Sequence, residues 1–264
     1  MAETLGPTII LTLLGLVPST IWLLFYLSRD KHPEPRRLIL LVFVLGFMTV
    51  PIAGLLEVQM NCWLGFDQHL LCFLGSATTP LVGGLASLLA VFGFGALVEE
   101  GLKFLAVRLS IWEHPALDEP IDAMMYMVVA ALGFAAAENM GNVWGLAQAS
   151  LSSLSLATIA NGTHPAFQLM TLRFFGATLL HTLTSGIVGY FIAIKRFKLV
   201  RFGMRGLIGR GLTYAVLIHA LFNILIRKWQ VLQNPVFGFA VLALLLGAFI
   251  ILMRDLHALS KRSR

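Results

Sequence analysis

Two adjacent carboxylates and a lysine, Glu99, Glu100 and Lys103, stand inside an otherwise largely apolar run from Leu81 to Val107. A charged side chain at the centre of a bilayer costs roughly 2.5–3.5 kcal/mol even on insertion scales. Three such groups so close together need polar partners. We expect those partners to come from other apolar segments of the chain.

Three other apolar runs carry groups of this kind: Glu138 with Asn139, then His181, and then His219 with Asn223. His219 and Asn223 are four residues apart, so they share a helix face, and Asn223 is placed to fix the tautomer of His219. We predict that these residues meet the 99–103 cluster inside a helix bundle and form a hydrolytic site. The alternatives without catalysis are simpler. The 99–103 cluster would be a charged helix end at the membrane interface, Glu138 and Asn139 would form polar contacts between helices, and the histidines would be ordinary core residues.

The spacing of the 99–103 cluster suggests a division of labour. Glu99 and Lys103 have the better orientation for an i,i+4 ion pair, because the acid precedes the base. We therefore predict that Lys103 holds Glu99 while Glu100 activates a water; a bend near Gly101 would exchange the two acids. The remaining predicted roles are proton transfer or water binding by Glu138, and oxyanion stabilisation by the two histidines, His181 and His219.

A metal-dependent version of the site is the alternative. In it, Glu138, His181 and His219 bind zinc with water as the fourth ligand. The metal-free version is favoured because no two of these residues have the helix-face spacing of a zinc motif. The H-E-x-x-H and G-x-S-x-G motifs are both absent.

The composition is that of an integral membrane protein. Of the 264 residues, 58% are hydrophobic and 12% are charged, whereas soluble domains carry about 25% charged residues. We predict one domain over residues 1–264, an all-α polytopic bundle in the plasma (inner) membrane. The net charge of +6 is not a sign of nucleic-acid binding, because Lys and Arg collect in the cytoplasmic loops of membrane proteins.

Seven apolar runs approach or exceed the roughly 20 residues that cross a hydrocarbon core. The third is long enough to be tilted, or broken near its glycines, and the sixth is short. An N-out, C-in topology places fifteen of the nineteen Lys and Arg residues inside. The expected spans are Pro7–Leu27, Leu38–Leu56, Leu81–Leu109, Ile121–Leu146, Phe167–Ile194, Leu212–Ile226 and Val236–Met253.

Both cysteines, Cys62 and Cys72, lie in the loop between the second and third spans, which has no Lys or Arg. Two cysteines in an oxidising compartment form a disulfide in many proteins. The spacing alone leaves two readings open, a disulfide or two unpaired thiols at the membrane interface.

Together these residues resemble the PrsW family of intramembrane proteases, which is distantly related to the CAAX-prenyl-protease and bacteriocin-processing membrane enzymes. The family's E-E-x-x-K motif matches residues 99–103, its F-x-x-x-E-N motif matches 134–139, and its histidine motifs match His181 and His219–Asn223. The first loop, Asp30–Arg37, is similar to the family's D-x-x-x-E-P-x-R segment. The chain departs at Asp122–Met127, which lacks both glycines of D-G-x-x-Y-G; we expect this to narrow the pocket beside Glu138.

The resemblance implies hydrolysis of peptide bonds within or beside the membrane. The implied substrate is a membrane-embedded protein, an anti-sigma factor for some bacterial members. Metal-dependent and glutamate-based members have both been described, so the implied cofactor is zinc or none. The expected partners are the substrate protein and the lipid bilayer, with no nucleic acid.

Two other classes of function compete with the protease. A proton- or ion-coupled transporter also places Glu, His and Lys inside the membrane, but no repeat pairs the first three spans with the last three, as transporters usually show. A scaffold could hold a membrane partner with the same polar residues.

Overall fold

Helices make up all the regular structure in the part of the chain that the computed structural model describes, residues 2–30, 32–65, 72, 84–149, 161–162, 164–199 and 206–262. The helices are α1 (Ala2–Leu14), α2 (Val17–Leu27), α3 (Arg36–Trp63), α4 (Gly84–Ser110), α5 (Pro120–Ala149), α7 (Pro165–Arg173), the π-helical η2 (Phe174–Thr178), α8 (Leu179–Arg196), α9 (Leu207–Leu232) and α10 (Pro235–Ser260).

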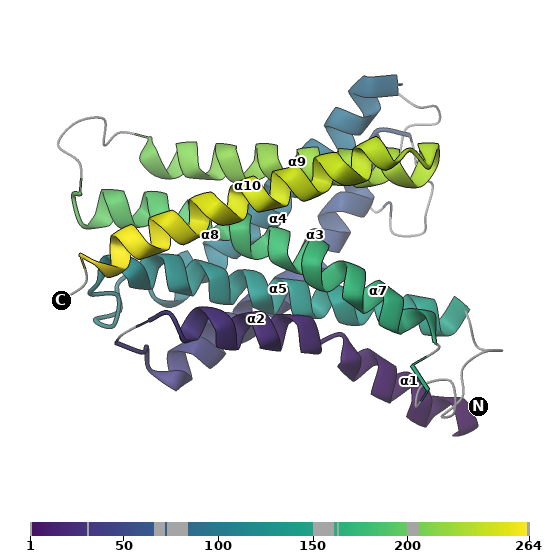
Figure 1. Cartoon of the computed structure of the whole chain (residues 1–264), viewed down its shortest axis with the longest axis horizontal. Coiled ribbons are helices and arrows are strands. Elements are labelled where there is room, and N and C mark those ends of the chain that lie inside the picture. Colours follow the sequence, from purple (N-terminus) through teal and green to yellow (C-terminus); the bar gives the residue numbers. More distant parts are fainter. Residues whose placement is uncertain are drawn as a thin grey trace.

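Six of the helical segments are long and apolar enough to cross a membrane: Gly6–Leu27, Arg36–Trp63, Pro120–Leu146, Pro165–Arg196, Leu207–Leu232 and Pro235–Ser260. The charged helix α4 is a seventh long segment, with 27 residues, and packs between α3 and α9. These findings confirm the prediction of an all-α polytopic membrane bundle. The first segment is bent into α1 and α2, and the fourth joins α7, η2 and α8 end to end (Figure 1).

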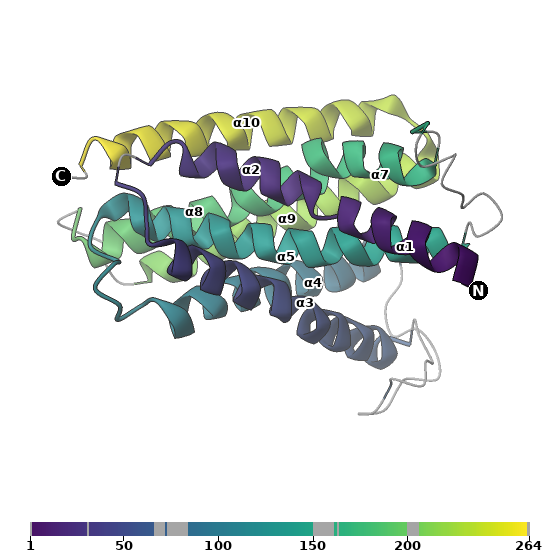
Figure 2. The ribbon, with the colours of Figure 1, turned by 90° about the horizontal axis from the view of Figure 1, so that it is seen from below.

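Helix α5 lies at the centre of the bundle. Its apolar window is 94% buried inside the protein, against 17% for that of α3. Figure 2 shows α5 in the middle, with α10 and α3 on opposite sides. The outer helices keep large apolar side chains exposed, among them Leu40 on α3, Leu217 on α9 and Phe239 on α10, as expected of surfaces that face lipid.

The backbones of α3 and α5 approach closely at two glycines. A Cβ atom on Gly133 would lie 2.0 Å from the Phe43 carbonyl oxygen, and one on Gly46 would lie 2.1 Å from that of Ala130. Only glycine permits such an approach. The small-residue segment Gly133–Ala137, which precedes Glu138, is therefore a helix contact.

One span differs from its expected form, and for another the structure excludes one of the two forms that the sequence left open. The sixth, expected to be short, is the 26-residue helix α9, because the helix continues beyond the apolar run into residues such as Arg210 and Lys228. The third is the uninterrupted helix α4 over its described residues, not a helix broken at its glycines. A helix satisfies its own backbone hydrogen bonds, so neither polar flanks nor an isolated glycine must end it.

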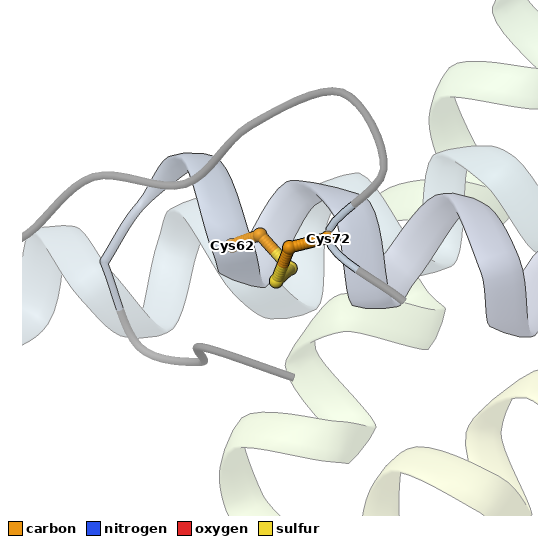
Figure 3. Close-up of a disulfide and its surroundings, with 2 residues drawn as sticks. All are labelled: Cys62 and Cys72. Carbon is orange, nitrogen blue, oxygen red and sulfur yellow. A yellow bond between two sulfur atoms is a disulfide. The ribbon is translucent and has the colours of Figure 1, made fainter. Parts of the chain in front are cut away.

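Cys62, near the end of α3, forms a disulfide with Cys72 (Figure 3). Of the two readings of this pair, the disulfide is therefore confirmed. Helix α1 begins at one end of the bundle and α10 finishes at the other (Figures 1 and 2), which agrees with an odd number of crossings. Which end faces the cytoplasm remains a prediction.

Candidate active site

The polar residues singled out in the apolar runs converge from four helices. α4 contributes the 99–103 cluster, α5 contributes Glu138, α8 contributes His181 and α9 contributes His219. Atoms of neighbouring members of this group lie within 2.8–3.9 Å of each other. The convergence that the sequence predicted is therefore present in the structure.

Glu100 is fully buried and fully engaged. Lys103 Nζ lies 3.0 Å from its Oε1, and His219 Nδ1 lies 2.8 Å from the same oxygen. From α8, the hydroxyl of Thr184 donates to Oε1 at 3.0 Å and that of Ser185 donates to Oε2 at 3.3 Å. Glu100 thus ties α4, α8 and α9 together and has little freedom to meet a substrate.

Glu99 is the acid that faces the open side of the cluster. Lys103 Nζ lies 3.7 Å from its Oε2, farther than from Glu100. Glu99 Oε2 is buried, yet no hydrogen-bond donor reaches it among the described residues. The sequence predicted that Lys103 holds Glu99 and that Glu100 faces the substrate. In the structure the two acids have the opposite roles. Spacing could not show this, because i+3 and i+4 residues are both neighbours on a helix and the deciding hydroxyls come from α8.

Both histidines are oriented by carboxylates. Lys103 Nζ lies 2.8 Å from His181 Nδ1; an ammonium can only donate, so Nδ1 accepts and Nε2 carries the proton. That Nε2 donates to Glu138 Oε2 at 2.9 Å. His219 Nδ1 donates to Glu100, which leaves His219 Nε2 3.8 Å from Glu99 Oε2 and His181 Nδ1 3.9 Å from it.

Asn223 was predicted to orient His219, and this prediction is wrong. Glu100 holds the Nδ1 atom instead, and Asn223 lines the cavity in front of the cluster. A charged hydrogen bond to a carboxylate is stronger than a neutral one to an amide. His219 therefore bonds to Glu100 on α4 and not to Asn223 on its own helix.

Asn139 joins helices rather than meeting the cavity. Its amide donates to Thr178 Oγ1 at 3.0 Å, and its carbonyl accepts from Arg173 Nε. Arg173 Nη2 also lies 2.9 Å from Glu138 Oε2 and forms a salt bridge with it. Glu138 is thus held between Arg173 and His181.

A cavity of about 720 Å³ opens in front of these groups. Its polar wall includes Glu99, Glu138, His181 and His219, and the rest is mainly apolar, with Leu172, Phe175, Phe222, Trp229, Phe239 and Leu242 among its lining residues. A second cavity, of about 660 Å³, lies between α3, α5 and α7 and also reaches Glu138.

The Asp122–Met127 segment lines neither cavity. It stands eleven or more residues before Glu138 on α5, at least about 16 Å away along a helix that rises 1.5 Å per residue. The expected narrowing of the pocket by its missing glycines is therefore wrong.

Glu99, His181 and His219 have the arrangement of a metal site. Each offers one ligand atom, and the three atoms lie within 4.8 Å of one another. Each histidine also donates its other ring N–H to a carboxylate, the usual support of metal-bound histidines. The predicted set used Glu138 in place of Glu99, but Glu138 already accepts from His181 Nε2. The residues fit a zinc ion held by nitrogen and oxygen.

Comparisons with known proteins identify the family of this chain. A family model described as the PrsW family intramembrane metalloprotease matches residues 34–253. The chain is 28% identical to the Protease PrsW of Geobacillus kaustophilus over 153 residues, 58% of this chain and 59% of that protein. It is 26% identical to that of Bacillus subtilis over 186 residues, 70% of this chain and 68% of the relative. It is 23% identical to the Protease PrsW of Oceanobacillus iheyensis over 239 residues, which are 90% of this chain and 88% of that relative.

No solved structure matches this chain. The match to Geobacillus kaustophilus spans about three fifths of that relative's length. The family model, however, covers most of the chain, including every residue of the cluster. The protein belongs to the PrsW family of intramembrane metalloproteases.

Proposed function

We propose that this protein hydrolyses peptide bonds of membrane-embedded protein segments at the cavity bounded by Glu99, His181 and His219. The observation that carries the proposal is the state of Glu99 Oε2: it is buried, has no hydrogen-bond donor among the described residues, and lies 3.8–3.9 Å from a nitrogen of each histidine. The apolar walls of the cavity suit a substrate segment that comes from lipid.

These three side chains would hold a divalent metal ion, with zinc as the first candidate. A bound zinc ion supplies Lewis-acid chemistry: it polarises a carbonyl group and makes a water molecule a better nucleophile. Glu100 and Glu138 keep the two rings turned toward Glu99 by holding their other nitrogens. Lys103 offsets the negative charge that Glu99 and Glu100 place at the buried end of the site.

Glu138 is the residue best placed to move a proton in this site. Its Oε2 lies 2.9 Å from His181 Nε2, and the side chain lines both cavities. It can therefore reach a substrate group in the cavity while remaining tied to a ring nitrogen. General acid–base help of this kind contributes about 10²–10⁴ in rate.

A metal-free mechanism is the second candidate, and one contact favours it. Lys103 Nζ lies 2.8 Å from His181 Nδ1, the nitrogen that a metal would need. In this version Glu99 takes the proton from the attacking water itself. The two versions have the same cavity and the same Glu99, but only the first needs a metal.

The proposed activity is tested with purified, reconstituted protein and a fluorogenic reporter whose scissile bond lies in an apolar membrane segment. Glu99→Gln should lose at least about 100-fold in cleavage rate, because a role in binding or activating water requires the carboxylate. Glu113→Gln, an exposed acid outside both cavities, serves as the matched control and should cleave at the wild-type rate.

Cleavage by Glu99→Gln at the wild-type rate would contradict the proposed site. The same preparations distinguish the other classes of function. Glu99-dependent proton or ion flux without cleavage would support a transporter, and partner binding without cleavage or flux would support a scaffold. The substrate that the family resemblance suggests, a membrane-spanning anti-sigma factor, is the first natural candidate to place in this assay.

A further inference from the structure

A second group of carboxylates lies outside the active site. Asp30 and Glu34 come from the loop between α2 and α3, and Asp122 comes from the first turn of α5. One carboxylate oxygen of each lies within 4.8 Å of the other two. All three residues are buried, with exposed fractions of 8%, 9% and 1%. They belong to two segments that the sequence singled out and that line neither cavity of the proposed protease.

Two of these carboxylates are fixed by hydrogen bonds. Asp122 Oδ2 accepts the backbone N–H groups of Asp118 at 3.1 Å and Glu119 at 2.6 Å. Glu34 Oε2 accepts the hydroxyl of Tyr126 at 2.5 Å. The loop and the start of α5 are thus held in a defined relation without any contribution from the third carboxylate.

Asp30 is different, because one of its oxygens has no partner. Oδ1 accepts the backbone N–H of His32 at 3.0 Å, whereas Oδ2 is buried with no hydrogen-bond donor among the described residues. A buried oxygen of this kind is costly unless something binds it. Its two acidic neighbours cannot do so while they are ionised.

Positive side chains do not balance this group in the part of the chain that the structure describes, where no lysine or arginine nitrogen forms a salt bridge with any of the three. The imidazole of His32 pairs with Glu119 instead, at 3.0 Å. Burial raises the pKa of the Asp30 carboxyl and that of the Glu34 carboxyl. The cluster is therefore neutralised either by protons or by a cation.

We propose that Asp30, Glu34 and Asp122 bind a divalent cation of the Ca²⁺ or Mg²⁺ class, which joins the α2–α3 loop to the start of α5. The set offers only carboxylate oxygens, which are the ligands that these hard cations prefer. It contains no imidazole or thiolate, so it differs in chemistry from the Glu99–His181–His219 group. The site is structural, because Asp122 lies sixteen residues before Glu138 on α5, about 24 Å away along a helix that rises 1.5 Å per residue.

Ca²⁺ is the probe of choice, because it prefers oxygen ligands and binds poorly to the imidazole nitrogens of the Glu99–His181–His219 group. Thermal unfolding of the purified full-length protein in detergent is followed with Ca²⁺ and with a chelator. At a Ca²⁺ concentration about 100-fold above its dissociation constant, the wild type should unfold roughly 5 °C higher than in chelator. Asp30→Asn should lose this rise, whereas the exposed Glu113→Gln should keep it.

The sign of the Asp30→Asn effect gives the sharper test. In chelator the variant should unfold at a higher temperature than the wild type, because it relieves repulsion among buried acids; in Ca²⁺ the order should reverse. If Ca²⁺ leaves the wild type unchanged, protons alone neutralise the cluster and the proposal is overturned. Should Asp30→Asn not fold, equilibrium dialysis of the wild type with radioactive Ca²⁺ decides: about one ion per chain supports the site, and none at millimolar Ca²⁺ refutes it.

Discussion

Glu99 and Glu100 are neighbours in the chain but point about 100° apart around the helix, which has 3.6 residues per turn. One meets hydroxyls from α8 and a histidine from α9, and the other meets the cavity. The two acids should therefore fail in different ways when each is changed to glutamine.

Glu100→Gln should mainly lower the stability of the folded protein. Removing its charge leaves Lys103 buried without its nearest acidic partner, and breaking a buried ion pair in this way costs about 3–5 kcal/mol. We expect Glu100→Gln to show a clearly lower unfolding temperature in detergent, whereas Glu99→Gln should unfold near the wild-type temperature while losing cleavage. Equal stability of the two variants would contradict the assignment of Glu100 as the structural acid.

Which residues converge could be predicted from single residues, because a charge in an apolar run must find a partner. What each of these residues does in the cluster could not be predicted in this way. Thr184 and Ser185 carry no charge and stand in a segment that gave no signal of its own, yet they decide which acid is held. Asn223 has the right spacing to reach His219, but a carboxylate from another helix takes that nitrogen.

At the scale of the helices, the crossing of α3 and α5 sets the position of Glu138. The two backbones meet at Gly46 and Gly133, and Glu138 follows Gly133 by little more than one turn. A shift of this crossing would move the carboxylate away from His181. Small residues such as Gly133 are typical of a contact between membrane helices, but the sequence does not show which helix is the partner.

Gly133→Ala should disturb this crossing, because its added Cβ would lie 2.0 Å from a backbone oxygen of α3. Overpacking of this kind typically costs about 1–3 kcal/mol, so we expect lower folded yield and lower activity. Gly141→Ala is the matched control on the same helix, since a Cβ there meets nothing within 4 Å. Folded yield and unfolding temperature in detergent are the measurements; if the two variants behave alike, α3 and α5 do not pack as described.

Helix ends were harder to predict than helix centres. The apolar run of α9 ends well before the helix does, because Arg227, Lys228 and their neighbours continue the hydrogen-bonded backbone beyond it. The π-helical turn Phe174–Thr178 left no mark in the sequence. It lies directly before α8 and ends three residues before His181.

At the scale of the whole molecule, the distribution of Lys and Arg predicts which end faces the cytoplasm. A cysteine introduced at the exposed Asn161 should react with a membrane-impermeant thiol reagent in intact cells. One at the exposed Lys261 should react only after the membrane is opened. The native cysteines are bonded to each other and give no background. The reverse labelling pattern would overturn the N-out, C-in orientation.

The central claim is that Glu99, His181 and His219 from three helices form one metal-dependent hydrolytic site. Its most direct test is the metal content, by mass spectrometry, of a purified preparation that cleaves its reporter, compared with that of His219→Ala. We predict about one zinc ion per wild-type chain, as a single site of this ligand type requires, and almost none in the variant. A preparation that cleaves at full rate without bound metal would contradict the claim and leave the glutamate mechanism in its place.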